Sequence, residues 1–211
     1  MSGSYGSEGI MKIIEHQGNG INYYTLVNNH HMSVTIMDWG ATVTAIKTHD
    51  KDGNFANIVL GFDDGADYIT YQSFFRATIA RVAGIIKNAR WRQYDLTQNA
   101  GENHLNGGNM PQISFEPWFL ERKLHTSDQV GLVMQYITLD GENGYPGTMT
   151  ITANFVLDND GKPMRSQLGL SLQAQKLPDA IHHKEFGSII IEPNIPVTYQ
   201  TAYRFSNIYD V

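Results

Sequence analysis

Apolar and polar residues alternate with a period of two through much of the chain. Met32, Val34 and Ile36 are separated by polar neighbours, and residues 149–157 repeat the pattern over a longer run. Successive side chains of a β-strand point to opposite faces, so this period is typical of a strand with one buried face. The pattern therefore predicts a strand in each of these segments.

Three further segments are rich in β-branched and aromatic residues and are also predicted to be strands. They cover residues 130–139, 167–175 and 196–205. Turn-forming pairs separate the strands: Asp52-Gly53, Asp140-Gly141, Asn143-Gly144 and Asp160-Gly161. One short helix is expected within residues 66–75. Regularly spaced strands with so little helix predict an all-β fold, either an antiparallel β-sandwich or a barrel.

The domain organisation follows from length and composition. The chain has 211 residues, which suits one domain. Residues 1–10 are rich in Ser and Gly and are expected to be a flexible leader, and no linker or internal repeat divides the remainder. We therefore expect residues 11–211 to form a single β-sandwich domain.

Composition also limits the classes of partner. The formal net charge is −6, and the chain has no basic stripe of the kind that nucleic-acid binding requires. Cysteine is absent, which excludes disulfides, thiolate nucleophiles and Cys-based zinc sites and agrees with a cytoplasmic location. No apolar run reaches the roughly 18 residues of a membrane span. The expected partner is therefore a small molecule, not a nucleic acid or a membrane.

Metal-binding patterns are also missing from the sequence. His30-His31 and His182-His183 are adjacent pairs, and neighbours on a strand would point to opposite faces. No metalloprotease-type spacing, nucleophile elbow or phosphate-binding loop is present. No metal site is predicted, and the remaining candidate chemistry is an acid–base site built from carboxylates, His and Arg.

One polar segment, GENHLNGGN at residues 101–109, lies between regions of alternating apolar residues. It has two interpretations. Asn106-Gly107 is a strong hairpin signal, so the segment can be a plain turn in which Asn106 adopts a positive φ. It can also be a rigid loop that carries a polar side chain to the mouth of a binding site.

Several motifs, taken in order, resemble those of the aldose 1-epimerase (galactose mutarotase) family. They are VLGFDDGADY (59–68), RATIARVAGIIKNARW (76–91), LNGG (105–108), NGYPG (143–147) and LSLQAQKLPDAIHH (170–183). The resemblance runs from about residue 20 to the C-terminus. It implies a galactose mutarotase-like β-supersandwich, which agrees with the alternation described above.

The resemblance also implies a reaction. The family interconverts the α and β anomers of aldohexoses: a carboxylate base removes the proton from O1, and an imidazolium protonates the ring oxygen. The open-chain aldehyde rotates and closes again, so no cofactor is needed. The implied partner is a small-molecule aldohexose.

The side chains expected for this reaction are substituted. The family base falls on Gln173, and the His of the family's LHGG motif falls on Asn106. The sugar-binding Arg falls on Ile85, with Gly84 before it in place of Asn. Arg81 matches the first Arg of the same motif and is a candidate substrate-binding residue, although the family's sugar contact is attributed to the second Arg.

His104 is a candidate replacement for the missing imidazole. It lies two residues before Asn106 and would share a face with it on an extended backbone. A two-residue step nevertheless shifts a side chain by roughly 7 Å.

The long central stretch of the family is also absent, as if two family segments had been joined across residues 158–163. In the family this stretch supplies an Asp and another His, which the resemblance implies is the acid that protonates the ring oxygen. Loss of strands would expose sheet edges and apolar surface. A stable chain would then close a smaller sandwich or cover its edges by forming a homo-oligomer.

Three functional interpretations follow. The chain is an aldose 1-epimerase-like protein with weak or lost catalysis, a non-catalytic carbohydrate-binding module on the same fold, or an internally deleted form without a function of its own.

Overall fold

A five-stranded antiparallel sheet forms the N-terminal part of the fold. The computed structural model describes residues 10–50, 52–159, 176–177 and 179–203. The strands follow one another in chain order: β1 (Lys12–Gly18), β2 (Ile21–Val27), β3 (Ser33–Met37), β4 (Thr42–His49) and β5 (Phe55–Asn57). The register shifts between Thr35 and Ile36 where β3 meets β4, which marks a bulge. A meander of this kind needs only short turns between neighbours.

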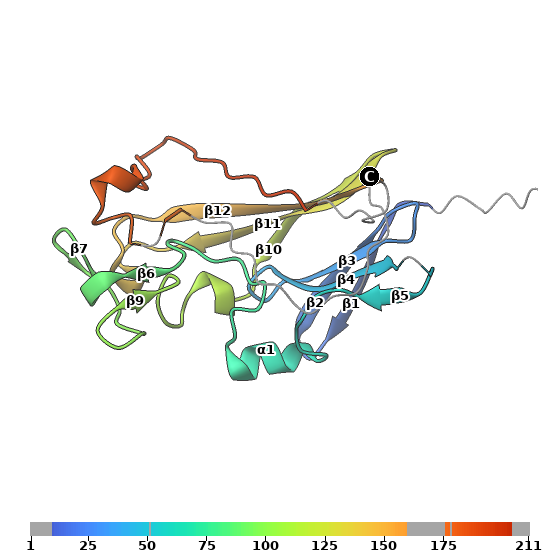
Figure 1. The fold of residues 1–211 in the computed structure, drawn as a ribbon, viewed down its shortest axis with the longest axis horizontal. Helices are drawn as coiled ribbons and strands as arrows, with labels where there is room; N and C mark the ends of the chain where they lie inside the picture. The colour runs from blue at the N-terminus through green and yellow to red at the C-terminus, as the bar shows by residue number, and fades with distance from the viewer. Residues whose placement is uncertain (1–9, 51, 160–175, 178, 204–211) are drawn as a thin grey trace, which may run out of the picture.

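A second sheet of three antiparallel strands packs against the first (Figure 1). It contains β10 (Phe119–His125), β11 (Gln129–Thr138) and β12 (Met149–Asp158). One hydrophobic core joins the sheets, and its buried members include Leu26 and Ile36 from the first and Leu132 and Met134 from the second. The fold is thus an all-β sandwich, which confirms the one of the two predicted architectures, sandwich or barrel, that the family resemblance also implied.

Alternation along β12 follows the predicted pattern. Ile151, Ala153 and Phe155 pack against the core, while Thr152 and Asn154 between them are exposed. The strand predicted at 130–139 is β11, and the short helix predicted within 66–75 is α1 (Gly65–Tyr71). These predictions are confirmed.

Short elements connect the two sheets and lie beside them. β6 (Ile85–Ile86) pairs with β9 (His104–Leu105), and β7 (Arg90–Trp91) pairs with β8 (Tyr94–Asp95). Single 3₁₀ turns cover Lys87–Ala89, Ile113–Phe115, Glu142–Gly144 and Lys184–Phe186. Helix α1 begins after Asp64, whose side chain accepts a hydrogen bond from the backbone N–H of Ala66.

The prediction of a strand at residues 196–205 is wrong for the part of this segment that the structure describes. Residues 196–203 have no regular secondary structure, and all are exposed. Alternation is typical of a strand with one buried face, but the strand forms only where a neighbour supplies hydrogen-bond partners. The strand predicted at 167–175 lies outside the described residues. Within the described part, no helix has the length and apolar character to cross a membrane.

Candidate functional site

Arg81 is bonded to the end of β11 and to the turn that follows it. Its guanidinium donates hydrogen bonds to the Thr138 hydroxyl and to the carbonyl oxygens of Leu139 (3.0 Å), Pro146 (2.9 Å) and Gly147 (2.6 Å). Burial lowers the pKa of Arg81 below its ordinary value. These acceptors use most of the guanidinium's donor capacity, so the side chain supports the turn between β11 and β12.

Asn143, in the NGYPG turn, fastens that turn to the loop after LNGG. Its Nδ2 donates to the carbonyl oxygens of Asn109 (2.9 Å) and Pro111 (3.0 Å), and its Oδ1 accepts from the Asn109 N–H (2.9 Å). A Cβ on Gly108 would collide with the Asn143 side chain. The NGYPG and LNGG motifs, which are far apart in sequence, are thereby held together by hydrogen bonds between the Asn143 side chain and backbone groups.

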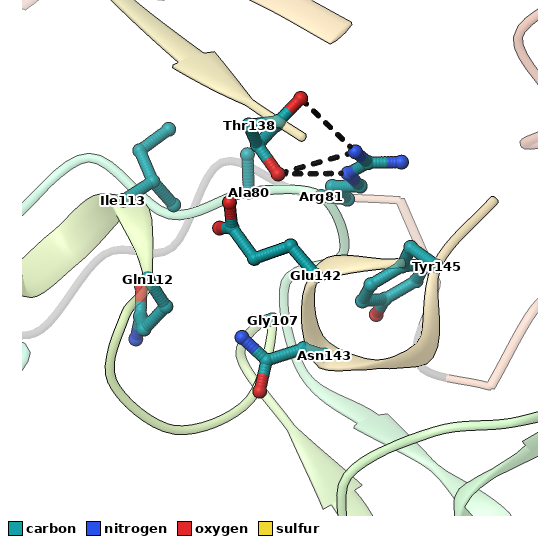
Figure 2. A pocket seen from close by; sticks show the side chains of 9 residues that line it. All are labelled: Ala80, Arg81, Gly107, Gln112, Ile113, Thr138, Glu142, Asn143 and Tyr145. Atoms are coloured by element: carbon teal, nitrogen blue, oxygen red, sulfur yellow. Dashed lines mark hydrogen bonds between the residues drawn. The ribbon is translucent and has the colours of Figure 1, made fainter. Parts of the chain in front are cut away.

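A small pocket lies between these two connections (Figure 2). Its lining residues are Ala80, Arg81, Gly107, Gln112, Ile113, Thr138, Glu142, Asn143 and Tyr145. The volume open to the centre of a water molecule is about 10 Å³. That is room for about one water molecule. The pocket cannot hold a hexose ring.

Asn106 and Ile85 lie side by side where β6 meets β9. The N–H of Asn106 donates to the Gly84 carbonyl (3.0 Å), and its Oδ1 accepts from the Gly84 N–H (2.8 Å). Its φ of 49° is in the left-handed region. The Asn106 side chain therefore closes a turn. Ile85 pairs with Leu105, and its side chain is 43% exposed.

Gln173, the position that matches the family base, lies outside the described residues. The structure places Asn106 and Ile85, which the resemblance predicts to be substituted family positions, next to each other. Arg81 lies at the nearby turn, where its hydrogen bonds go to protein acceptors.

His104 is fully buried, with an exposed fraction of 0%. Its Nδ1 is 2.7 Å from the Thr97 carbonyl oxygen, and its Nε2 is 2.7 Å from the Tyr145 hydroxyl. Because a carbonyl can only accept, Nδ1 carries the proton and Nε2 accepts from Tyr145. Burial lowers the pKa of His104. The side chain is a neutral part of the interior, and both of its ring nitrogens are bonded.

A carboxylate and two imidazoles lie against β6, an arrangement that the sequence reading missed. The N–H of Asp179 donates to the Ile85 carbonyl (3.1 Å), and its Oδ1 accepts from the Lys87 N–H (3.2 Å). The same Oδ1 is 2.7 Å from His182 Nδ1, and Oδ2 is 3.8 Å from His183 Nε2. A sequence signal existed in the i, i+3 spacing of Asp179 and His182.

The geometry of this cluster departs from the expectation for adjacent histidines. His182 and His183 lie on a turn instead of a strand, so both rings approach Asp179. Burial raises the pKa of Asp179, but the bonds from His182 and Lys87 outweigh it and leave the pKa below its ordinary value. Within the described part of the chain, no group of three or more His, Cys, Asp or Glu side chains could hold a metal ion.

A wider hollow lies on the β1–β2 hairpin. It is an open groove with a volume of about 250 Å³, and its lining residues are Glu15, His16, Gln17, Asn22, Tyr23 and Tyr24. The rings of His16 and Tyr23 stack 4.5 Å apart. Polar and aromatic side chains meet here, but none belongs to the motifs that matched the family.

Comparisons with known proteins match the chain to aldose 1-epimerases and galactose mutarotases. The family model described as aldose 1-epimerase matches residues 22–167. The chain is 32% identical over 133 residues to "Galactose mutarotase" of Bos taurus, covering 60% of this chain and 36% of that protein. It is 31% identical over 144 residues to "Aldose 1-epimerase" of Escherichia coli strain K12, covering 65% of this chain and 40% of that protein.

A solved structure supports the same relationship. The galactose 1-epimerase from Lactobacillus acidophilus NCFM matches with a TM-score of 0.61 and 25% identity, covering 72% of this chain and 45% of that chain. The chain therefore spans less than half the length of the relatives that it matches. The family model nevertheless covers more than half of the chain, and with the ordered motifs and the sandwich fold it shows that the chain belongs to the aldose 1-epimerase family.

Proposed function

We propose that the chain binds aldohexoses on the aldose 1-epimerase fold and interconverts their anomers weakly or not at all. The observation that carries this proposal is the junction of β6 and β9. Asn106 occupies the position of the family His, and its amide is bonded to Gly84. Ile85 replaces the sugar-binding Arg with an apolar side chain. Neither side chain can transfer a proton near neutral pH.

The expected loss of rate is large. General acid and general base catalysis each contribute about 10²- to 10⁴-fold, and Gln173 at the base position would remove the second group. The two losses do not simply multiply, because proton-transfer groups that act as a unit are not additive. Substitution of even one group reduces catalysis by orders of magnitude.

Sugar binding, in contrast, needs only hydrogen-bond donors, acceptors and apolar surface. The pocket at Arg81 is too small for a sugar ring, so we assign recognition to the exposed surface formed by Ile85 and Asn106. The chain covers 36% to 40% of the length of these curated relatives, so the proposed surface is the part of a binding site that this length can supply.

Two NMR measurements test the proposal. Titration with galactose and glucose should shift the amide signals of residues around Ile85 and Asn106, with dissociation constants of about 1 mM or weaker. Shifts confined to the groove formed by Glu15, Gln17 and Tyr24 would move the proposed site to the hairpin. No shift at tens of millimolar sugar would exclude binding and leave a form without a function of its own.

Anomer exchange on α-galactose and α-glucose measures catalysis directly. The expected result is a rate close to that of buffer alone. An exchange rate far above this background, at protein concentrations well below that of the sugar, would show that the chain is an active epimerase.

A second candidate function keeps weak catalysis. His182 is hydrogen bonded to Asp179, which is itself bonded to the backbone of β6. An imidazole oriented by a carboxylate can move protons near neutral pH. If this pair acts on a sugar bound near Ile85, His182→Gln abolishes the residual exchange, and the matched variant His30→Gln leaves it unchanged.

A further inference from the structure

The two large sheets end in four edge strands, and three of these carry features that discourage pairing with another chain. β5 has only three residues. β1 carries Lys12, Glu15 and His16. β10 carries Glu121, Arg122 and Lys123, and its register shifts between Leu120 and Arg122. Short length, charged side chains and bulges are the usual means by which proteins protect sheet edges.

β12 is the least protected of the four edge strands, because its one charged residue, Asp158, lies at its end. It is ten residues long and pairs with β11 over its full length without a register shift. Residues 149–157 contain no charged residue, proline or glycine. Among the described residues, β12 pairs with β11 alone. A long edge without a register shift and without charge over residues 149–157 favours addition of another strand.

The core beneath this edge is incompletely covered. In β11 the core-facing side chains of Val130, Leu132 and Met134 are fully buried. The equivalent row of β12 contains Ile151 and Phe155, which are only half-buried. Apolar surface is thus left accessible on the side where a neighbouring strand would lie.

We propose that this edge pairs with β12 of a second copy of the chain, in an antiparallel arrangement with a two-fold axis at Ala153. Such a dimer would place Met149 opposite Leu157 and Ile151 opposite Phe155 on the core face. The smallest side chain, Ala153, meets its own copy at the axis. On the outer face, Thr152 lies opposite Asn154 and Thr150 opposite Val156. A strand that is its own complement in this way suits a two-fold interface.

The lack of charged residues between residues 149 and 157 also favours a second copy of the chain over a partner strand that carries charges. Self-pairing brings no like charges together between residues 149 and 157, although each chain has a net charge of −6. The product would be a continuous six-stranded sheet of β10, β11 and β12 from each copy. Pairing would pack the half-buried apolar side chains of one β12 against those of the other. The free backbone N–H and C=O groups of both edges would form hydrogen bonds with each other.

Light scattering after size exclusion, over about a hundredfold range of concentration, measures the oligomeric state. The expected mass is twice 23.7 kDa at the upper end of the range. The double variant Thr152→Lys with Asn154→Lys places four lysines around the axis and should give a monomer. The change brings the net charge from −6 to −4, so dissociation would come from local repulsion and not from overall charge.

A control and a rescue keep the result specific. Gln93→Lys with Gln98→Lys adds the same charge at exposed positions outside the large sheets and should stay dimeric. Thr152→Glu with Asn154→Glu should be monomeric alone and form a mixed dimer with the Lys variant. A wild-type protein that is monomeric at all concentrations overturns the proposal. This includes a monomer whose β12 amides are protected from hydrogen exchange, because another segment of the same chain would then cover the edge. A lysine variant that stays dimeric, or a mixture that stays monomeric, also overturns the proposal.

Discussion

The Tyr145 hydroxyl donates a hydrogen bond of 2.7 Å to Nε2 of the buried His104, and the two rings meet edge to face with centroids 5.2 Å apart. This contact joins the NGYPG turn to the strand that precedes LNGG. Tyr145→Phe would leave the Nε2 lone pair buried and unsatisfied. We expect it to lower the free energy of unfolding by about 1–3 kcal/mol. Urea denaturation measures the loss.

Tyr71→Phe is the matched control, because Tyr71 is largely exposed. It should change the stability by no more than about 0.5 kcal/mol. Equal effects of the two substitutions would show that the buried bond to His104 contributes nothing specific.

Stability should depend on pH through His104. Burial lowers its pKa in the folded chain, whereas the unfolded chain has the ordinary value of about 6.5. Below this value the unfolded state binds a proton that the folded state does not. The stability that the neutral His104 contributes to the folded state is therefore fully present above about pH 6.5. It is lost as the pH falls from this value towards the pKa of His104 in the folded chain.

The measurement is the free energy of unfolding between about pH 5 and 7 for the wild type and for His104→Gln. The wild-type slope should be steeper by at most about 1.4 kcal/mol per pH unit, the limit for one proton. Parallel curves for the two proteins would assign the pH dependence to other groups.

Gly107 is required by the packing of the LNGG loop. It has a φ of +88°, and a Cβ there would collide with the Ala80 carbonyl oxygen. Gly107→Ala should lower the free energy of unfolding by about 2–5 kcal/mol, from left-handed strain and overpacking together. Gly101→Ala is the control: Gly101 has a φ of +63° but open space around it, so only strain of about 1–2 kcal/mol is expected. Thermal unfolding distinguishes the two, and an equal loss would contradict the packing argument.

Arg81 should be structural, and its removal should affect stability more than sugar binding. Arg81→Lys keeps the charge but cannot reproduce the fork that reaches Leu139, Pro146 and Gly147. We expect a loss of about 2 kcal/mol or more in the free energy of unfolding. Arg122→Lys, at an exposed position of β10, should change it by less than about 0.5 kcal/mol. A loss of sugar binding in Arg81→Lys without a loss of stability would instead make Arg81 a substrate contact.

The sequence predicted an all-β fold because the period-two pattern depends only on which face of each strand is buried, and the family resemblance favoured the sandwich over the barrel. It could therefore identify β11 and β12 before their partners were known. The same pattern failed at residues 196–203, which pair with no strand of the part of the chain that the structure describes. The roles of His104 and Asp179 could not be predicted from the sequence. They depend on hydrogen bonds with Tyr145 and Lys87, which are distant along the chain. Asn106 could be read as a turn residue because the Asn-Gly signal is local.

Restoring the family side chains should not restore the activity. Asn106→His, Ile85→Arg and Gln173→Glu would return the LHGG histidine, the sugar-binding Arg and the base that the resemblance implies, but not the His of the absent central stretch. Proton transfer, however, requires each group to lie within about 2.6–3.2 Å of the proton that it moves. The described pocket holds about one water molecule, and Asn106→His would also remove the side-chain oxygen that accepts the hydrogen bond from the Gly84 N–H. We expect anomer exchange by the triple variant to stay at the rate of buffer alone, with circular dichroism confirming that it is folded. A folded triple variant that accelerates exchange at least about tenfold would show that this chain forms a productive sugar cleft, and that the three side chains alone limit its catalysis.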